Sequence, residues 1–166
     1  MKTAKYWITK LNLEKHPEGG WFKEVYRSVE MISAKCLSGI FNGDRNISTS
    51  IYYLLEGDDF SAFHRIKSDE IWHYYAGNSS IEIITIRNGE IEIQQLGNQS
   101  EEGHVFQFVV PAETWFAARV GNKKGFALVG CTVSPGFHFD DFELAGKNLI
   151  DEFPLLENQI RSLIRI

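Results

Sequence analysis

Residues 60–77 read FSAFHRIKSDEIWHYYAG, and this stretch decides the fold class. Its alternation of apolar and polar side chains predicts one strand over 60–66 and a second over 70–75, joined by a three-residue turn. Because successive side chains of a strand point to opposite faces, His64 in the first strand and Glu70 in the second can both point inward. We therefore expect His64 and Glu70 to meet on the inner wall of one hairpin.

Strand-like segments continue on both sides of this hairpin. Each is short and bounded by Gly or Asn signals, which is typical of an all-β sandwich or barrel. The turn at 88–89, Asn-Gly, fixes one register by pairing Ile86 with Ile91 and Ile84 with Ile93. The predicted strands cover residues 22–28, 48–55, 60–66, 70–75, 80–86, 90–96, 105–110, 115–120 and 126–132.

A helix is predicted at each end of the chain. In the first, Ala4, Trp7, Ile8 and Leu11 form one helical face behind the capping residue Thr3. The second, over 153–164, opens with a proline in its first turn and carries another apolar stripe. Because no linker, repeat or low-complexity tract interrupts the chain, we expect a single domain over residues 1–166, with both helices outside the strands.

Composition excludes several classes of protein. The 166 residues carry a net charge of −5 without a run of Lys or Arg, so nucleic acid is not an expected partner. No apolar stretch approaches the roughly 20 residues that span a bilayer, and the start lacks the apolar core of a secretory signal. Cys36 and Cys131 lie far apart without a CxxC motif, which favours the cytoplasm. Aromatic residues, at 13%, are expected to fill part of the core and to line part of a ligand cavity.

The central hairpin resembles the first motif of the cupin superfamily. That motif has a His, a second His two residues later, a Glu three or four residues further on, and a Gly seven residues beyond the Glu. In this chain the four positions hold His64, Ile66, Glu70 and Gly77. The second cupin motif, Pro-x-Gly-x-x-His, aligns with residues 111–116, of which only the proline matches.

Three longer stretches resemble one uncharacterised cupin subfamily, a domain of unknown function. They are HPEGGWF at 16–22, FSAFHRIKSDEIW at 60–72 and CTVSPGF at 131–137, and the resemblance covers about residues 5–145. It implies a double-stranded β-helix, the cupin jelly roll, with a small-molecule pocket inside the barrel. It also implies a homodimer.

The resemblance bears on a metal site as well. Metal-binding cupins supply three His and one Glu, whereas this chain offers only His64 and Glu70 at those positions, because Ile66 and Phe116 replace two histidines. His73 is three residues from Glu70 and points to the opposite face of a regular strand. We therefore expect no cofactor, and a divalent metal, if present, would be held by His64 and Glu70.

Three functions stay open. Similarity to cupin-fold deoxysugar epimerases, which work without metal, favours an epimerase or isomerase of sugars or nucleotide sugars. His64 would be its base, Glu70 the acid that orients His64, and Tyr74 or Tyr26 the proton donor. The alternatives are a non-catalytic module that binds or senses a small ligand, and a metal-dependent oxygenase or isomerase. A purely structural ion pair between His64 and Glu70 is also physically adequate.

Five side chains are candidate ligand contacts: Glu24, Tyr26, Trp72, Phe116 and Phe137. The first two share strand parity whereas Arg27 faces the other way, and which side is inside stays open. Segment 16–20 is either a simple chain reversal or a loop that carries Glu18 or Trp21 to the pocket mouth.

Overall fold

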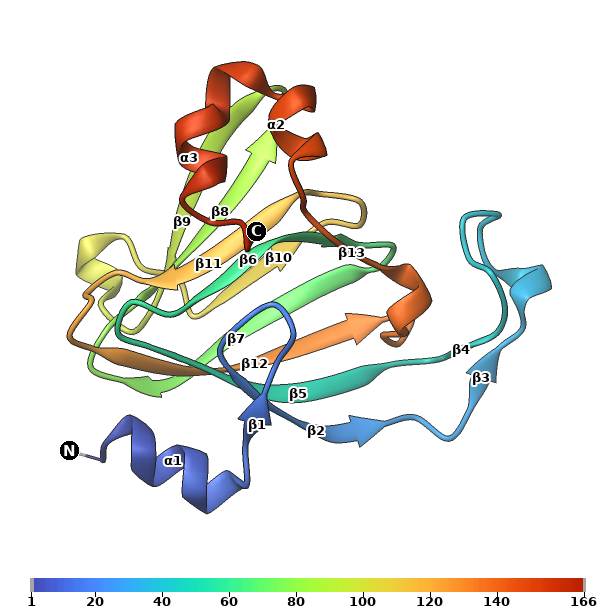
Figure 1. Ribbon diagram of the computed structural model, residues 1–166. Coiled ribbons are helices and arrows are strands. Elements are labelled where there is room, and N and C mark those ends of the chain that lie inside the picture. Colours follow the sequence, from blue (N-terminus) through green and yellow to red (C-terminus); the bar gives the residue numbers. More distant parts are fainter. Residues whose placement is uncertain (1, 166) are drawn as a thin grey trace.

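Two antiparallel sheets pack face to face in the computed structural model, which describes residues 2–165 (Figure 1). The first sheet contains, in spatial order, β1 (Glu14–Lys15), β2 (Trp21–Arg27), β5 (Thr49–Glu56), β12 (Phe126–Ser134), β7 (Asp69–Gly77) and β10 (Gln107–Val110). The second contains β13 (Phe142–Leu144), β6 (Phe60–Ile66), β11 (Phe116–Val120), β8 (Ile81–Arg87) and β9 (Glu90–Leu96). This all-β architecture confirms the predicted jelly roll.

All nine predicted strands are present, with ends shifted by at most two residues. The register of the β8–β9 hairpin is also confirmed, since Ile86 pairs with Ile91 and Ile84 with Ile93. The sequence pattern missed the very short strands β1, β13, β3 (Met31–Ile32) and β4 (Arg45–Asn46). Strands of two or three residues are too short to show an alternating pattern.

The N-terminal helix α1 (Ala4–Leu11) is capped as predicted, because the Thr3 side chain accepts a hydrogen bond from the backbone N–H of Tyr6. The predicted C-terminal helix is present, but it is shorter than 153–164 and broken. The structure has instead α2 (Asn148–Glu152), the 3₁₀ turn η4 (Pro154–Leu156) and α3 (Glu157–Arg161). Pro154 explains the break, because a proline forces the preceding residue, Phe153, out of the helical region. Among residues 2–165, no helix is long and apolar enough to cross a membrane.

Apolar residues form three layers. Between the sheets, Tyr53, Trp72 and Phe116 are the largest members of the central cluster. Outside the second sheet, α2 and α3 pack over Trp115 and its neighbours. Outside the first sheet, α1 covers Leu54 and adjacent residues (Figure 1). The adjacent residues Trp115 and Phe116 therefore face opposite sides of β11, as strand alternation requires.

Strands β3 and β4, with the 3₁₀ turn η1 (Ala34–Cys36), form an arm that projects from the body (Figure 1). Arg45 on this arm is buried and joins Asp141 through two hydrogen bonds of 2.5 and 2.7 Å. Asp141 belongs to the 3₁₀ turn η3 (Phe139–Asp141), whereas η2 (Ser100–Glu102) lies between β9 and β10. The arm thus holds the segment 137–142 that, as shown below, covers the cavity.

Candidate functional site

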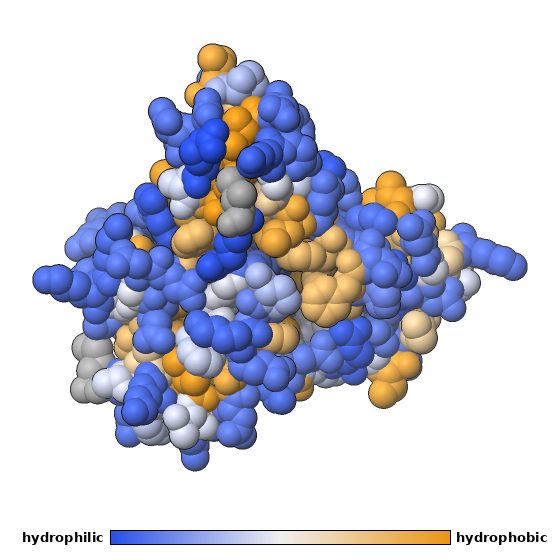
Figure 2. Space-filling view, viewed as in Figure 1, coloured by the Kyte–Doolittle hydropathy of each residue, from blue (hydrophilic) through white to orange (hydrophobic). Residues whose placement is uncertain are grey.

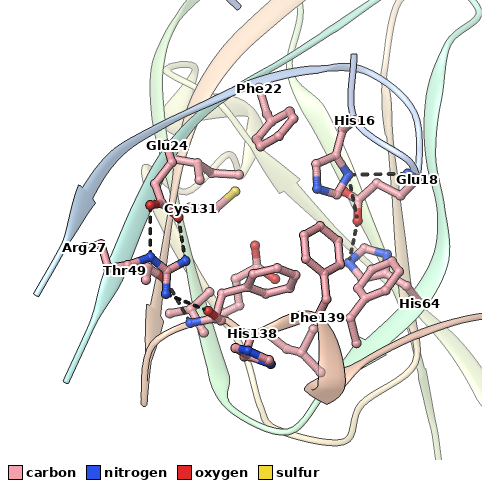
Figure 3. A pocket seen from close by; sticks show the side chains of 16 residues that line it. His16, Glu18, Phe22, Glu24, Arg27, Thr49, His64, Cys131, His138 and Phe139 are labelled. Atoms are coloured by element: carbon pink, nitrogen blue, oxygen red, sulfur yellow. Dashed lines mark hydrogen bonds and ion pairs between the residues drawn. The ribbon is translucent and has the colours of Figure 1, made fainter. Parts of the chain in front are cut away.

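A cavity of about 310 Å³ opens between the two sheets, beside the segment 137–142. Strands β2, β5, β7 and β12 form one wall, and β6 with β13 forms the other (Figure 3). Figure 2, in the same view as Figure 1, shows apolar side chains at the surface near the middle of the molecule. The lining residues are His16, Glu18, Phe22, Glu24, Arg27, Thr49, Ile51, His64, Ile66, Glu70, Cys131, Val133, Phe137, His138, Phe139 and Phe142.

The loop over residues 16–20 carries Glu18 into this cavity. Gly19 and Gly20 adopt φ angles of +116° and +72°, which side-chain-bearing residues rarely adopt. The Tyr53 hydroxyl donates to the carbonyl of Gly19 (2.7 Å), and the N–H of Ala62 donates to the carbonyl of Glu18 (2.9 Å). The loop is therefore both a chain reversal and part of the cavity wall.

We predict that Gly20→Ala lowers the free energy of unfolding by about 2 to 4 kcal/mol. A Cβ atom there would lie 2.8 Å from the Tyr53 hydroxyl and would also need the left-handed backbone conformation. Gly103→Ala is the matched control, because Gly103 has a φ of +81° but open space around its Cβ position. Urea denaturation measures the free energy of unfolding of both variants. Equal losses in Gly20→Ala and Gly103→Ala would contradict the close packing around Gly20.

His64 forms the centre of the inner part of the cavity. Its Nδ1 lies 2.8 Å from the carbonyl oxygen of Ala62, and its Nε2 lies 3.3 Å from Oε2 of Glu18 (Figure 3). The other oxygen of Glu18 accepts a hydrogen bond from the Ser61 hydroxyl (2.9 Å). Phe116 packs against the His64 ring, with 4.1 Å between ring centroids. The carboxylate that pairs with His64 is thus Glu18, and the expected orienting role of Glu70 is wrong.

His16 lies on the other side of Glu18, with its Nδ1 3.6 Å from Oε2. The Nδ1 atom also accepts a hydrogen bond from the backbone N–H of Glu18 (3.4 Å), which places the ring proton on Nε2. Burial lowers the pKa of His16, and nearby His64 acts in the same direction, while Glu18 opposes both. We conclude that His16 is uncharged at neutral pH.

Glu70 faces the same cavity in a different environment. Burial, together with the nearby charge of Glu18, raises the pKa of Glu70 to about 8. The neighbouring Cys131 is buried too, which raises its pKa well above the usual range and keeps it a thiol. At neutral pH the cavity therefore presents a protonated carboxyl group at Glu70 and a carboxylate paired with histidine at Glu18.

Arg27 and Glu24 form a second polar group, near the mouth. Two hydrogen bonds join them, at 3.0 and 2.7 Å, and both side chains remain partly exposed (Figure 3). The prediction that Arg27 faces away from Glu24 is wrong. A register shift between Glu24 and Tyr26 bulges β2 at Val25 and brings Arg27 to the cavity side. Tyr26, a predicted ligand contact, is 53% exposed and lies outside the cavity lining.

The remaining predicted contacts divide between the cavity and the core. Phe137 lines the cavity as expected. Trp72 is 1% exposed and belongs to the central cluster, and Phe116 supports His64 from within that cluster. Tyr74 lies four residues along β7 from Glu70, roughly 13 Å away, and its hydroxyl donates to the carbonyl of Ser79. The structure therefore removes Tyr74 from the proposed chemistry.

The structure also identifies lining residues beyond the predicted ligand contacts. In the HPEGGWF motif, Glu18 was one of two alternatives for the pocket mouth and does line the cavity, whereas His16 was not predicted to do so. The aromatic segment 137–142 contributes Phe139 and Phe142 beside Phe137. Its carbonyl at Phe137 accepts a hydrogen bond from Arg27 (3.1 Å). No periodic signal could have found these residues, because they come from loops, a 3₁₀ turn and a strand of only three residues.

The donor set does not fit a cupin metal centre. Two of the positions that carry histidine in metal-binding cupins hold Ile66 and Phe116, which have no donor atoms, and both are buried. His64 already contacts Glu18, and Glu70 retains a proton at neutral pH. Within the described residues 2–165, no three His, Cys, Asp or Glu side chains are grouped so as to hold a metal ion.

A family model described as "Cupin superfamily (DUF985)" matches residues 5–145. The chain belongs to this DUF985 cupin family. Protein SO0799 of Shewanella oneidensis has a similar structure, with 36% identity, a TM-score of 0.88 and 99% of each chain covered. A hypothetical protein of Leishmania major gives a TM-score of 0.88 at 30% identity, covering 99% of this cupin and 100% of that chain.

A curated yeast protein is also similar to this DUF985 cupin. It is the uncharacterized protein YML079W of Saccharomyces cerevisiae, 31% identical over 143 residues, which cover 81% of this chain and 71% of the yeast protein. A function for this chain is therefore inferred from the residues of the cavity. The homodimer and the cytoplasmic location stay predictions.

Proposed function

We propose that this DUF985 cupin is a small-molecule epimerase or isomerase that transfers protons on a carbonyl compound without a metal ion. The observation that carries the proposal is the pair of carboxyl groups in one cavity, Glu18 beside a histidine and Glu70 in its protonated form. A carboxyl group whose pKa is raised into the neutral range, as that of Glu70 is, is typical of acid–base enzymes. The apolar walls would keep water away from the reacting atoms.

His64 is suited to be the base. The carbonyl of Ala62, 2.8 Å from Nδ1, keeps the proton of the neutral ring on that nitrogen, so the lone pair is on Nε2. In the free protein Nε2 faces Glu18, so the substrate must displace this contact before Nε2 can take the proton next to the carbonyl. When Nε2 takes that proton, the ring becomes positively charged. The Glu18 carboxylate, 3.3 Å away, stabilises this charge. The Ser61 hydrogen bond holds Glu18 in place.

Glu70 is suited to be the acid. Its proton goes to the carbonyl oxygen in an isomerisation, or to the opposite face of the same carbon in an epimerisation. In either case the C–H electron pair first moves into the enolate, His64 gains one proton and Glu70 loses one. In an isomerisation this gives an enediol, and His64 then returns its proton to the neighbouring carbon while Glu70 takes the proton of the hydroxyl that becomes the new carbonyl. Exchange with solvent, or the reverse step on the product, restores both groups.

One observation favours a second candidate, a module that binds a ligand without turnover. Both nitrogens of His64 already contact protein oxygens, at Ala62 and at Glu18. A histidine held in this way is also adequate as part of a fixed binding wall. Proton exchange separates the two candidates, because a binding module leaves the substrate protons unchanged.

The test is deuterium incorporation from heavy water, followed by NMR over a panel of cyclic ketones, reducing sugars and nucleotide sugars. We expect exchange next to the carbonyl of at least one compound, and His64→Asn should slow it about a hundredfold or more. His73→Asn, outside the cavity lining and in contact with Thr132, is the control and should change the rate little. An unchanged rate of deuterium exchange in His64→Asn would contradict the proposal. Loss of exchange after treatment with a chelator would favour the metal-dependent alternative.

A further inference from the structure

Each basic side chain of the cavity lining lies next to a carboxylate. Arg27 is neutralised by Glu24 through two hydrogen bonds, and His138 at the mouth lies 3.4 Å from a carboxylate oxygen of Asp140. Deeper in the cavity, His64 faces the carboxylate of Glu18. A ligand with a net negative charge would therefore meet no uncompensated positive side chain among the lining residues described by the structure.

The three remaining titratable groups of the lining add no charge. Burial keeps His16 in its neutral form and Cys131 as a thiol, and Glu70 retains its proton at neutral pH. An anion placed beside them would lie close to the Glu18 carboxylate, which would repel it. The inner end of the cavity thus favours hydroxyl or carbonyl groups, which both donate and accept hydrogen bonds without charge.

The guanidinium of Arg27 is also almost fully used. It donates to Glu24 twice, to Asn46 (2.8 Å) and to the carbonyl of Phe137 (3.1 Å). Since a guanidinium has five N–H groups, one of them remains for a ligand. One N–H suits a single hydroxyl or carbonyl oxygen, whereas recognition of a carboxylate or phosphate normally uses two parallel donors.

The volume and the apolar walls of the cavity limit the size and shape of the ligand. A volume of about 310 Å³ is at the lower end of the roughly 300 to 1,000 Å³ of small-molecule pockets. Between the two polar ends lie mostly apolar side chains, including the aromatic rings of Phe22, Phe137 and Phe142. Such walls fit the faces of one ring and leave little room for a nucleotide.

We propose that this cavity selects an uncharged, single-ring carbonyl compound over an anionic one, so that sugar phosphates and nucleotide sugars are not its substrates. This inference rests on the proposed function for the carbonyl group. The selection by charge follows from the pairing of the lining side chains alone. It narrows the substrate class to neutral rings with an oxygen function at each end.

The test uses two probes that differ only in charge, 4-oxocyclohexanecarboxamide and 4-oxocyclohexanecarboxylate. Ligand-observed NMR at pH 7 measures the affinity of each for the wild-type protein, for Glu24→Gln and for Glu14→Gln. Glu14→Gln is the matched control, because it removes the same charge from an exposed strand position outside the cavity lining. We expect the wild type and the control to bind the amide about tenfold more tightly or better.

Glu24→Gln leaves the positive charge of Arg27 uncompensated, so we expect its preference to shift by at least about tenfold towards the carboxylate. Equal or tighter binding of the carboxylate by the wild type would overturn the inference. So would an unchanged preference in Glu24→Gln, or binding of neither probe. If the protein prefers the neutral probe but catalyses no deuterium exchange, the proposed function is contradicted and this inference is not. If it catalyses exchange on an anionic compound, this inference is contradicted and the proposed function is not.

Discussion

Replacing Asp141 by alanine is expected to lower the free energy of unfolding by about 3 to 5 kcal/mol. Its two oxygens accept the hydrogen bonds of Arg45 at 2.5 and 2.7 Å, and Lys67 lies 3.5 Å from the carboxylate. The side chain of Arg45 is only 3% exposed, so the substitution leaves a buried cation without its partner. The segment 137–142 also loses its attachment to the arm, and ligand affinity should fall with stability.

A surface ion pair provides the matched control for Asp141→Ala. Glu143 lies two residues further on and pairs with Arg65 at 2.8 Å, but both side chains are well exposed. Glu143→Ala should therefore cost less than about 1 kcal/mol. The double substitution Arg45→Met with Asp141→Leu should recover most of the loss, because it removes both buried charges. Urea denaturation measures the free energy of unfolding of each variant. Equal losses for Asp141→Ala and Glu143→Ala would contradict a larger stabilising effect of the buried pair.

Glu70 is expected to make the protein less stable as the pH rises from about 4.5 to about 8. Its pKa is about 8 in the folded protein against a usual value of 4.5, so in this interval the folded state holds a proton that the unfolded state has lost. The stabilising effect of this proton is complete below pH 4.5 and disappears as the pH passes 8. The shift corresponds to a loss on the order of 3 to 5 kcal/mol over the interval.

The glutamine side chain in Glu70→Gln cannot ionise, so the free energy of unfolding of this variant should not fall between about pH 4.5 and 8. We expect Glu70→Gln to be more stable than the wild type at pH 8.5 and to have lost its proton-transfer activity. Glu92→Gln, at an exposed position of β9, should follow the wild type at every pH. Urea denaturation at several pH values measures the difference. Parallel curves for the wild type and Glu70→Gln would contradict a raised pKa.

The sequence was informative where structure depends on local patterns. Alternation predicted the strands that form the two walls, and the Asn-Gly turn fixed the β8–β9 register because only a few residue types suit that turn. Alignment of the sequence with the two cupin motifs also showed directly that Ile66 and Phe116 replace histidines. These predictions required no knowledge of how distant segments meet.

The partner of His64 could not be predicted in this way. Strand parity placed Glu70 on the correct face, but Glu18 comes from a loop 46 positions earlier in the chain and reaches His64 only because Gly19 and Gly20 turn sharply. Parity also failed for Arg27, because a single bulge in β2 reverses which side chains face inward. Loops and bulges therefore account for most of the differences between the predicted and the observed site.

Glu70 keeps its proton at neutral pH in the cavity that also contains Glu18. A ¹³C NMR titration of the protein labelled at the glutamate carboxyl carbons tests this directly, with Glu70→Gln used to assign the resonance of Glu70. We predict that this resonance titrates near pH 8 and that Glu18→Gln lowers its midpoint, because the charge of Glu18 contributes to the shift. A midpoint near the usual value of 4.5 would contradict the account.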